Sequence, residues 1–525
     1  MTRILLSLLF AFATFSANAA DPILRWSSAG DVLTFDYHAA ADTFSQNVGD
    51  QVYETLVRRG KNTKIEPALA VSWEIVDARR WRFRLRENVK FHDGTALTAD
   101  DVVFSVIRSQ HPNASNRALT TRVGHVRKID SSTVEFELDA PNPILLEHLL
   151  AAPVMSKAWC ERHGVVRPQD YIKREETYAV RHAMGTGPYM LKSYEPGVRT
   201  VLIRNPAYWE AADGNVGEAV YRPITNPATR IAALVSGELD FVLDPPPQDL
   251  ERIRGTPGLK VVEGTEWRVI HLGFDQFRDE LLYSNVKGKN PFKDRRVRLA
   301  FYQAIDVEAL RTKVMRGSAL PTGSIAFALG SSAPDTETRW PYDPAAARRL
   351  LAEAGYANGF EVRFDCPNNR YVNDEKICIA VSAMLAQIGI RAPVQAQPMA
   401  TFSPRLDARD VSFFLVGVGG GRDPQIALTL VGRSENAATG DGRFNAGRFA
   451  DPEVDRLIDA IKTEMDASRR EEMIRLTLLK LRDGVYLVPL HRQMLPWVMK
   501  SNVQVVPTPW NALELRWVRI GTDAR

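Results

Sequence analysis

The chain has 525 residues, of which 45% are hydrophobic, and its formal net charge at neutral pH is +4. This length exceeds what a single hydrophobic core usually supports, so we expect two or more structural units. The small net charge argues against a large polyanionic partner such as nucleic acid. Strand-like and helix-like segments are mixed along the whole sequence, without internal repeats, which is typical of an α/β protein.

The first 19 residues have the pattern of a secretory signal peptide. Arg3 supplies the positive end, residues 4–15 form a short apolar run, and Ala17 and Ala19 fit the small-residue rule for cleavage. The alternative is a membrane anchor, but about a dozen apolar residues are too few to span roughly 30 Å of hydrocarbon. With no cysteine near the cleavage point for lipid attachment, we expect cleavage near Ala19 and a periplasmic protein that is not a lipoprotein.

Residues 81–86 alternate apolar and cationic side chains, with Trp81, Phe83 and Leu85 on one face and arginines on the other. This period of two predicts a strand that is buried on one face. Interleaved bases and aromatics also occur in nucleic-acid-binding proteins, but no wider cationic region supports that function here. We therefore interpret the arginines as the solvated face of a strand.

Several helix boundaries can be predicted from capping residues. Thr98 is expected to cap a helix with two aspartates in its first turn, and Asp294 to cap another. Asp343 and Asp451 are each followed by proline, which fits the first position of a helix. Gly355 is expected to end the helix that begins after Asp343, in the left-handed conformation.

The three cysteines allow two interpretations. Cys366 and Cys378 can pair in an oxidising compartment and leave Cys160 over, whereas three buried free thiols are the simpler alternative. Their spacing resembles no zinc site, and the nine histidines form no His-Glu-x-x-His motif. We find no Gly-x-Ser-x-Gly motif and no phosphate-binding loop. We therefore expect no metal, no cofactor and no catalytic residue.

One ordered run of motifs resembles a known family. Trp73, the strand at 81–86, Phe91-His-Asp-Gly and Leu97-Thr-Ala-Asp-Asp-Val follow one another as in the family 5 solute-binding proteins of bacterial ABC importers. Further motifs continue the resemblance over nearly the whole chain, at residues 185–189, 205–209, 291–306, 342–355 and 449–458.

The resemblance implies a two-lobed fold of the type II periplasmic class. Lobe I would comprise residues 20–267, with an extra subdomain at about 47–185, and the chain would return to it at 496–525. Lobe II would comprise residues 268–495. The chain would cross between the lobes near 263–272 and again near 489–497, so these crossings would form the hinge and the cleft between the lobes would hold the ligand.

The resemblance also points to ligand residues in lobe II. In the peptide receptors of the family an acid in a glycine-rich turn pairs with the α-amine of the peptide, and its position falls on Gly420. A tryptophan of that turn falls on Gly417. Since both anchors are missing, a free peptide amine is not expected to be the main recognition group. Asp423 is retained, either as a cap of the turn or following helix or as a ligand contact.

Two arginines favour an acidic solute. Arg370 matches the arginine that holds the peptide carboxylate in the dipeptide receptor, although Tyr371-Val372 departs from the Pro-Tyr that follows it there. The structural alternatives are a salt bridge to Asp374 and a solvated loop arginine. Arg422 would face the same cleft. Because a guanidinium presents a planar fork to carboxylates and phosphates, the two together favour an acidic or oxyanion-bearing solute.

Three further candidates complete the expected site. Thr43 and Phe44 lie in the segment that reaches into the cleft from lobe I, as a hydrogen-bonding group and a stacking wall. Asn445, in a loop of lobe II, is a further candidate for a ligand contact.

The predicted function is therefore capture of a small peptide-like or carboxylate-bearing solute by a monomeric receptor, which delivers it to the membrane permease of an ABC importer. A secreted hydrolase with a two-lobed cleft is one alternative, but it requires a nucleophile or a metal set that we do not find. A peptide-binding chaperone or sensor on the same scaffold is the other, and it would bind solute without supporting uptake.

Overall fold

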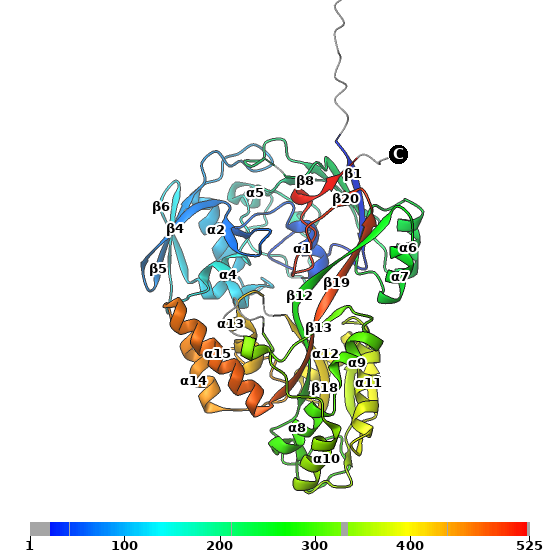
Figure 1. Ribbon diagram of the computed structural model, residues 1–525. Helices are drawn as coiled ribbons and strands as arrows, with labels where there is room; N and C mark the ends of the chain where they lie inside the picture. Colours follow the sequence, from blue (N-terminus) through cyan, green and yellow to red (C-terminus); the bar gives the residue numbers. More distant parts are fainter. Residues whose placement is uncertain are drawn as a thin grey trace, which may run out of the picture.

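The computed structural model describes residues 21–40, 42–211, 213–326, 334–419, 421–437 and 439–521. The predicted signal peptide and Gly420 lie outside these ranges. Two mixed α/β bodies are joined by two long antiparallel strands, β12 (Leu259–Phe274) and β19 (Leu487–Lys500) (Figure 1). The expected α/β class is thus confirmed. We call the body that contains strands β1–β11 lobe I and the body that contains β13–β18 lobe II. Within the described ranges no helix has the length and apolarity needed to cross a membrane.

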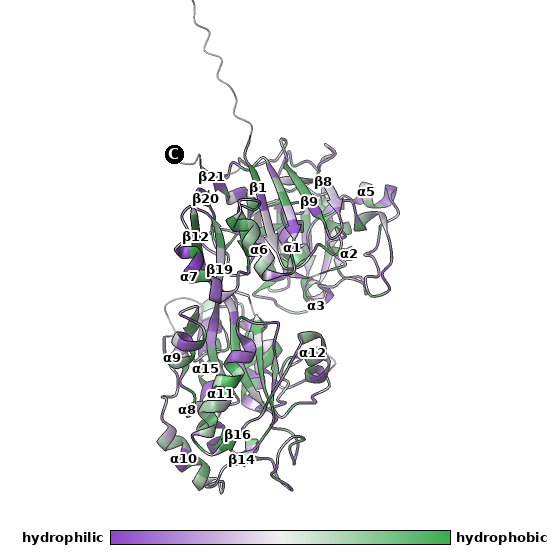
Figure 2. Ribbon diagram, turned by 90° about the vertical axis from the view of Figure 1, so that its right-hand side faces the viewer, coloured by the Kyte–Doolittle hydropathy of each residue, from purple (hydrophilic) through white to green (hydrophobic). Residues whose placement is uncertain are grey.

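The two joining strands belong to a sheet that runs through both lobes. Within the described residues this sheet has 11 strands, in the order β17-β15-β18-β12-β19-β11-β1-β10-β9-β8, with β13 on β19. The pairing of β12 with β19 shifts register between Thr265 and Val269, and again between Ile270 and His271. Such irregularities bend a ribbon. Viewed from the side, the lobes lie at opposite ends of this ribbon (Figure 2).

Lobe I is built on the half of the sheet that contains β1. Its core includes Trp26 and Tyr221, and also Trp497 and Leu515 from the C-terminal part of the chain. The chain therefore returns to lobe I after β19. Its elements here are β1 (Ile23–Ser28), α1 (Thr43–Gly49), η2 (Tyr178–Val180), β8 (Tyr189–Glu195), β9 (Arg199–Arg204), β10 (Glu218–Pro223), α6 (Pro227–Val235), β11 (Phe241–Leu243), η3 (Pro247–Asp249), α7 (Leu250–Arg254), β20 (Val503–Gln504), η8 (Leu515–Trp517) and β21 (Arg519–Ile520).

A separate four-stranded sheet, β4-β5-β7-β6, has its own core in lobe I. Trp81, Phe83 and Leu85 of β5 are buried as predicted, while Arg82 on the other face pairs with Glu135 at 2.8 Å. The elements of this region are β2 (Val57–Arg59), β3 (Ile65–Pro67), β4 (Ala70–Asp77), β5 (Arg80–Leu85), α2 (Ala99–Ser109), α3 (Arg117–Thr120), η1 (Thr121–Val123), β6 (His125–Asp130), β7 (Thr133–Glu137), α4 (Leu145–Leu149) and α5 (Lys157–Arg162).

The core of lobe II is rich in phenylalanine. Phe413 on β18 packs between Phe274 and Phe364, with ring centroids 5.6 and 4.3 Å away. The elements of lobe II are η4 (Pro291–Lys293), α8 (Arg295–Gln303), α9 (Val307–Ala309), η5 (Leu310–Val314), β13 (Ala319–Pro321), η6 (Pro334–Glu337), α10 (Pro344–Glu353), β14 (Phe360–Glu361), β15 (Phe364–Pro367), α11 (Asp374–Ala386), β16 (Ile390–Arg391), β17 (Val394–Gln397), α12 (Met399–Asp407), β18 (Phe413–Gly419), α13 (Pro424–Ala427), η7 (Leu428–Gly432), α14 (Pro452–Ile461) and α15 (Ala467–Gly484).

The predicted caps are present in both lobes. Thr98 precedes α2, and its backbone N–H donates to the Asp101 carboxylate at 3.0 Å. Asp294 and Asp343 accept backbone N–H groups at the starts of α8 and α10, and Asp451 does so at the start of α14. Gly355 follows α10 with a φ of 87°, in the left-handed region.

Candidate functional site

The two lobes face each other beside the register shifts of β12. Glu266 and Trp267 are buried there, and Arg268 pairs with Gly419 of β18 in the sheet. The shifts therefore place a charged segment of the ribbon next to the loops of both lobes.

Arg268 of β12 and Arg370 of lobe II both lie close to the ring of Tyr371. The Tyr371 ring centroid lies 5.8 Å from Cζ of Arg268 and 5.6 Å from Cζ of Arg370. The Tyr371 hydroxyl donates to the carbonyl of Gly417 at 3.2 Å, which holds the ring against β18. Loss of surrounding water and then the charge of Arg268 lower the pKa of Arg370. An anion between the two guanidinium groups would relieve this repulsion.

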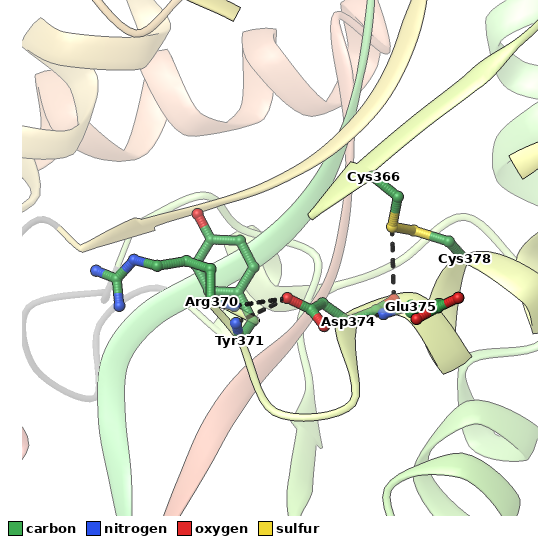
Figure 3. The surroundings of a disulfide bond; sticks show 6 residues. All are labelled: Cys366, Arg370, Tyr371, Asp374, Glu375 and Cys378. Carbon is green, nitrogen blue, oxygen red and sulfur yellow. Dashed lines mark hydrogen bonds between the residues drawn. A yellow bond between two sulfur atoms is a disulfide. The ribbon is translucent and has the colours of Figure 1, made fainter. Parts of the chain in front are cut away.

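The Arg370 side chain is exposed, and it forms no hydrogen bond or ion pair with any residue that the structure describes. Asp374, the expected structural partner, instead accepts the backbone N–H groups of Arg370 and Tyr371 at 2.9 and 3.0 Å (Figure 3). Its carboxylate thus shapes the loop and leaves the guanidinium to point away from it. The alternative of an Arg370–Asp374 salt bridge is wrong, because the carboxylate is occupied by backbone donors. The exposed guanidinium fits both the solvated loop arginine and the ligand anchor.

A disulfide fixes the ends of this loop. Cys366, in β15, is bonded to Cys378 of α11, and both are fully buried (Figure 3). Of the two interpretations left open by the sequence, pairing is found, and Cys160 is free and buried. Arg370 and Tyr371 lie within the segment that the disulfide closes, so their backbone is tied to the core of lobe II.

The glycine at position 417 is explained by Tyr371. A Cβ at Gly417 would lie 2.8 Å from Cε1 of Tyr371 and 2.7 Å from Cδ1 of Ile270, closer than real contacts allow. Tyr371 therefore fills space that a tryptophan at 417 would need. The two departures from the family pattern, at 371 and 417, are parts of one local packing arrangement.

Glu266 is the acid of this cluster, and each of its oxygens accepts one donor. Arg268 donates to it at 3.0 Å and Gln493 of β19 at 2.9 Å. Burial raises the pKa of Glu266, while Arg268 and Arg370 act against that rise. Since one of its oxygens already accepts from Arg268, Glu266 holds the Arg268 side chain in place.

Asp244 lies in lobe I opposite the two arginines and links two segments of that lobe by hydrogen bonds. This residue has a φ of 53°, and its carboxylate accepts from Ser28 at 3.2 Å and from Asn511 at 2.9 Å. Its negative charge reaches across to Arg370 and Glu266 and affects the pKa values of both. Lobe I thus presents polar, hydrogen-bonded groups opposite Arg268 and Arg370.

A second meeting point of the lobes involves Arg59 of β2. Its guanidinium lies over the ring of Trp267, 4.6 Å from the centroid, and forms an ion pair with Glu147 of α4. The ring of Trp510 also packs against Trp267, with the two ring centroids 5.6 Å apart. The charge of Arg422 lowers the pKa of Arg59, after burial as the larger cause, so Arg422 lies near the lobe I wall.

Asp423, also predicted as a ligand residue, is engaged within the protein. It caps α13 through the backbone N–H of Gln425 at 2.9 Å, and both its oxygens accept from Arg470 at 2.9 and 2.7 Å. The aspartate and the arginine are both buried. This arrangement favours the structural alternative that the sequence left open for Asp423.

The Asn445 side chain is buried rather than directed to solvent. Its amide donates to the carbonyls of Arg433 and Phe449 at 3.1 and 2.8 Å. Asn445 therefore ties its loop together. Gly420, the remaining lobe II candidate, lies outside the described residues.

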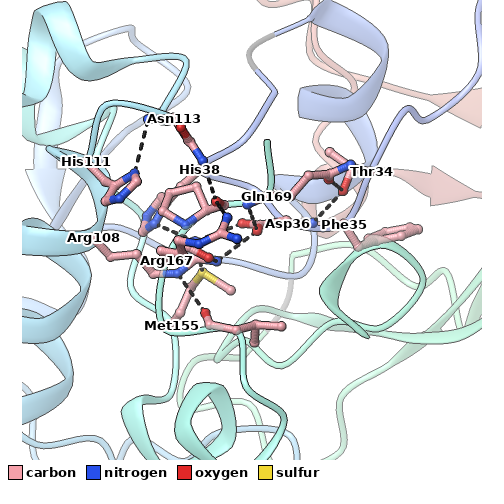
Figure 4. A network of polar contacts seen from close by, with 12 residues as sticks. Thr34, Phe35, Asp36, His38, Arg108, His111, Asn113, Met155, Arg167 and Gln169 are labelled. Carbon is pink, nitrogen blue, oxygen red and sulfur yellow. Dashed lines mark hydrogen bonds and ion pairs between the residues drawn. The ribbon is translucent and has the colours of Figure 1, made fainter. Parts of the chain in front are cut away.

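Thr43 and Phe44 open α1 on the lobe I side. Thr43 is exposed, whereas the Phe44 ring lies over Gly30, where an added Cβ would come within 2.3 Å of Cδ2. The loop before α1 is anchored by Asp36, which accepts from both terminal nitrogens of Arg108 at 2.8 Å in a fully buried pair (Figure 4). Burial also lowers the pKa of His38 in this network to about 3.

The sequence did not single out Arg268, Arg59, Trp267 or Trp510. The sequence could have pointed to Trp267 and Arg268, because both lie within the segment predicted to cross between the lobes. For Arg59 and Trp510 no local pattern marks a cleft position, since their neighbours come from distant parts of the chain.

Comparisons with known proteins agree with this geometry. Residues 64–438 match the model of bacterial extracellular solute-binding proteins, family 5. The periplasmic oligopeptide-binding protein OppA of Salmonella typhimurium is 28% identical over 90% of this chain and 88% of its own length. The glutathione-binding protein GsiB of Salmonella typhi is 27% identical over 87% of this chain and 86% of its own.

Solved structures of similar proteins share the fold. The substrate-binding protein CtaP of Listeria monocytogenes has a TM-score of 0.83 at 21% identity, with 95% of this chain and 99% of that chain covered. The binding protein AgaA of Agrobacterium, in complex with agropinic acid, has a TM-score of 0.74 at 23% identity and covers 95% of this chain and 99% of its own. With the family model matching well over half of its length, the chain belongs to family 5 of the bacterial extracellular solute-binding proteins.

Proposed function

We propose that the protein is the periplasmic receptor of an ABC importer and captures a peptide-like or carboxylate-bearing solute between its lobes. The proposal rests on two arginines, Arg268 and Arg370, that lie beside Tyr371. The guanidinium of Arg370 forms no ion pair with a carboxylate among the described residues. A solute carboxylate supplies the missing partner. The relatives support the class of solute, since their names include oligopeptide- and glutathione-binding proteins.

Capture follows from contacts that only the closed form makes in full. A solute held by Arg370 in lobe II and by the wall around Asp244 in lobe I stabilises the form in which both reach it. The population of that form rises by the differential affinity of the solute for the two arrangements. The register shifts in β12 supply a place where the ribbon can bend. No covalent step is needed, so we assign a binding role and no enzymatic one.

The remaining assignments rest on the family and the sequence together. The closed receptor docks as a monomer on a membrane permease, whose ATPase powers release. Residues 1–19 act as the cleaved signal peptide. Lobe I comprises residues 20–267 and 496–525, with the four-stranded sheet region as a subdomain at about 47–185, and lobe II comprises 268–495. The separate core of the four-stranded sheet supports the subdomain.

Among the predicted ligand residues, we propose Arg370 and Arg422 as solute anchors, with Thr43 as the exposed group of lobe I. The internal hydrogen bonds of Asp423 and Asn445 favour supporting roles for these two. Phe44 is retained as a wall beside the cleft.

A binding experiment tests the proposal. Di- and tripeptides and glutathione are first screened by thermal shift, since a ligand at 100 times its Kd adds about 2.7 kcal/mol to stability. The tightest binder is then titrated calorimetrically into wild type, Arg370→Ala and the control Arg349→Ala, which removes an exposed arginine of α10. We expect Arg370→Ala alone to weaken binding by about 2–5 kcal/mol. Unchanged affinity in Arg370→Ala would remove this anchor from the site.

Uptake separates the receptor from a chaperone or sensor on the same scaffold. A strain that lacks the protein should lose import of the solute identified by the screen, and the wild-type chain should restore it. Undiminished uptake in the deletion strain would contradict a role in import.

A further inference from the structure

Lobe I contains a cavity of about 190 Å³ that includes neither Arg268 nor Arg370. It lies between the end of α1, strand β2 and the C-terminal segment that returns to lobe I. Its walls combine aromatic rings with charged groups; they are formed by Tyr37, Asp50, Tyr53, Glu54, Thr55, Arg58, Arg59, Ala68, Leu150, Pro153, Pro188, Tyr208, Trp510, Glu514 and Arg516.

The three arginines of the cavity wall are already paired with carboxylates. Arg58 donates to Glu210 through two nitrogens, both at 2.7 Å. Arg59 pairs with Glu147, and Arg516 pairs with Glu514 at 3.2 Å. No positive charge of the wall is therefore left to balance a further anion.

Two carboxylates of the same wall have only neutral hydrogen-bond donors. Asp50 accepts from the hydroxyl of Tyr37. Glu54 accepts from Thr186 at 2.7 Å, from Tyr208 at 2.8 Å and from the Trp209 indole at 3.1 Å. Neither carboxylate forms an ion pair with a described residue. Both side chains are half-buried, and an unpaired charge is costly where it is cut off from water.

The titration of Asp50 reflects this lack of a cation. Burial raises the pKa of Asp50 to about 7, the Tyr37 hydrogen bond opposes the rise, and the charge of Glu514 adds to it. Burial also raises the pKa of Glu54. The other charged and titratable groups of the cavity wall are Tyr37, Tyr53, Glu54, Arg58, Arg59, Tyr208, Glu514 and Arg516.

The cavity adjoins the cleft between the lobes. Arg59 belongs to its wall, and its Nη2 lies 4.0 Å from the place of a Cβ at Gly421 in lobe II. Trp510, another wall residue, packs against Trp267 of β12. The cavity wall therefore includes residues that contact both lobe II and the joining strand β12.

We propose that this cavity is a second subsite, which takes a basic group of the bound solute, an ammonium or a guanidinium, opposite the Asp50 and Glu54 carboxylates. The inference rests on the proposed function and extends it, since the solute then carries an oxyanion at one end and a cation at another. A cation in the cavity gives both carboxylates the partner that the protein does not supply. The aromatic walls add favourable cation–π contacts.

The experiment compares tripeptides that differ only in one charge. Lysine is placed at the first, second or third position of trialanine, and each peptide is matched with its norleucine counterpart, which has a similar shape and no charge. Calorimetric titration at pH 8 uses wild type, Asp50→Asn and the control Asp213→Asn, which removes an exposed carboxylate of lobe I.

We expect wild type and Asp213→Asn to bind at least one lysine peptide roughly 10- to 100-fold more tightly than its norleucine counterpart. This preference should fall as the pH is lowered through 7, with proton release on binding, because Asp50 must ionise to hold the cation. Asp50→Asn should lose most of the preference for lysine over norleucine and its pH dependence. A thermal unfolding curve confirms that the variant is folded.

Equal affinity for the lysine and norleucine peptides at all three positions would overturn the subsite and leave the proposed function standing. A preference that Asp50→Asn retains in full would also overturn it. If none of the six peptides binds wild type, the peptide-like solute itself is refuted, and the subsite falls with it.

Discussion

The cleft beside Arg370 and the cavity beside Asp50 have opposite charge and one property in common. Arg370 has no carboxylate partner among the described residues, and Asp50 has no cationic one. By contrast, Asp36 with Arg108 and Asp423 with Arg470 are buried pairs in which each charge is matched. The matched charges stabilise each lobe from within, whereas we propose that the unmatched charges meet groups of the solute.

The largest loss of stability is expected when one partner of a matched charge pair is removed. Arg108→Ala leaves the Asp36 carboxylate buried without its partner, so we expect the free energy of unfolding to fall by about 3–5 kcal/mol. Urea unfolding of this variant is compared with that of Arg370→Ala, which should retain the stability of wild type. A loss below 1 kcal/mol in Arg108→Ala, or an equal loss in both variants, would erase the distinction between the two kinds of charge.

The disulfide beside Arg370 should make a smaller contribution to the free energy of unfolding. Its cysteines are 12 residues apart in sequence. Loop closure of this size is worth roughly 2–3 kcal/mol, so replacement of both cysteines by serine should lower the free energy of unfolding by that amount. Because the disulfide anchors the Arg370 loop, the solute affinity should also fall. Full affinity in the double variant, measured by titration, would show that the loop does not need this anchor.

Removal of an unmatched charge should stabilise the free protein. Since the folded-state pKa of Asp50 is raised to about 7, its ionised form opposes folding above that pH, and protonation stabilises the fold as the pH falls through 7. Asp50→Asn should therefore raise the free energy of unfolding at pH 8 by about 1–4 kcal/mol, and by roughly a third of that near pH 5, where Asp50 is protonated in the folded state but still ionised in the unfolded state. Urea unfolding at both pH values measures this, and destabilisation at pH 8 would argue for a cation partner within the protein.

The smallest effect on solute affinity is expected when an ion pair between the lobes is removed. Arg122 of lobe I lies 3.5 Å from Asp441 of lobe II, and the arginine is partly exposed. Arg122→Ala should change the solute affinity by less than about 1 kcal/mol. A larger loss in titration would mean that this contact, rather than the solute, drives the approach of the lobes.

Local patterns in the sequence were sufficient for much of the fold. The alternation at 81–86 predicted β5, and the caps at Thr98 and Asp343 predicted the starts of α2 and α10, because these features depend on neighbouring residues alone. The ordered motifs identified the family that the comparisons then established.

The candidate site was harder to predict because its residues find their partners far along the chain. Asp423 is bound by Arg470, 47 residues away, and no local sequence pattern predicts this pairing. Arg59 meets Trp267 only when the lobes are assembled. The Asp50 cavity was not foreseen, since it joins α1, β2 and the C-terminal segment. Arg370 was found through its resemblance to one family position, and the reason for its tyrosine neighbour became clear only from Gly417.

The central claim is that two lobes close on a solute anchored by Arg370. Small-angle scattering tests it directly, with wild type and Arg370→Ala measured alone and with a saturating concentration of the peptide that gives the largest thermal shift. We predict that the radius of gyration of wild type falls on addition of the peptide, and that Arg370→Ala at the same peptide concentration shows a smaller decrease. An unchanged radius of gyration for peptide-saturated wild type would contradict the account.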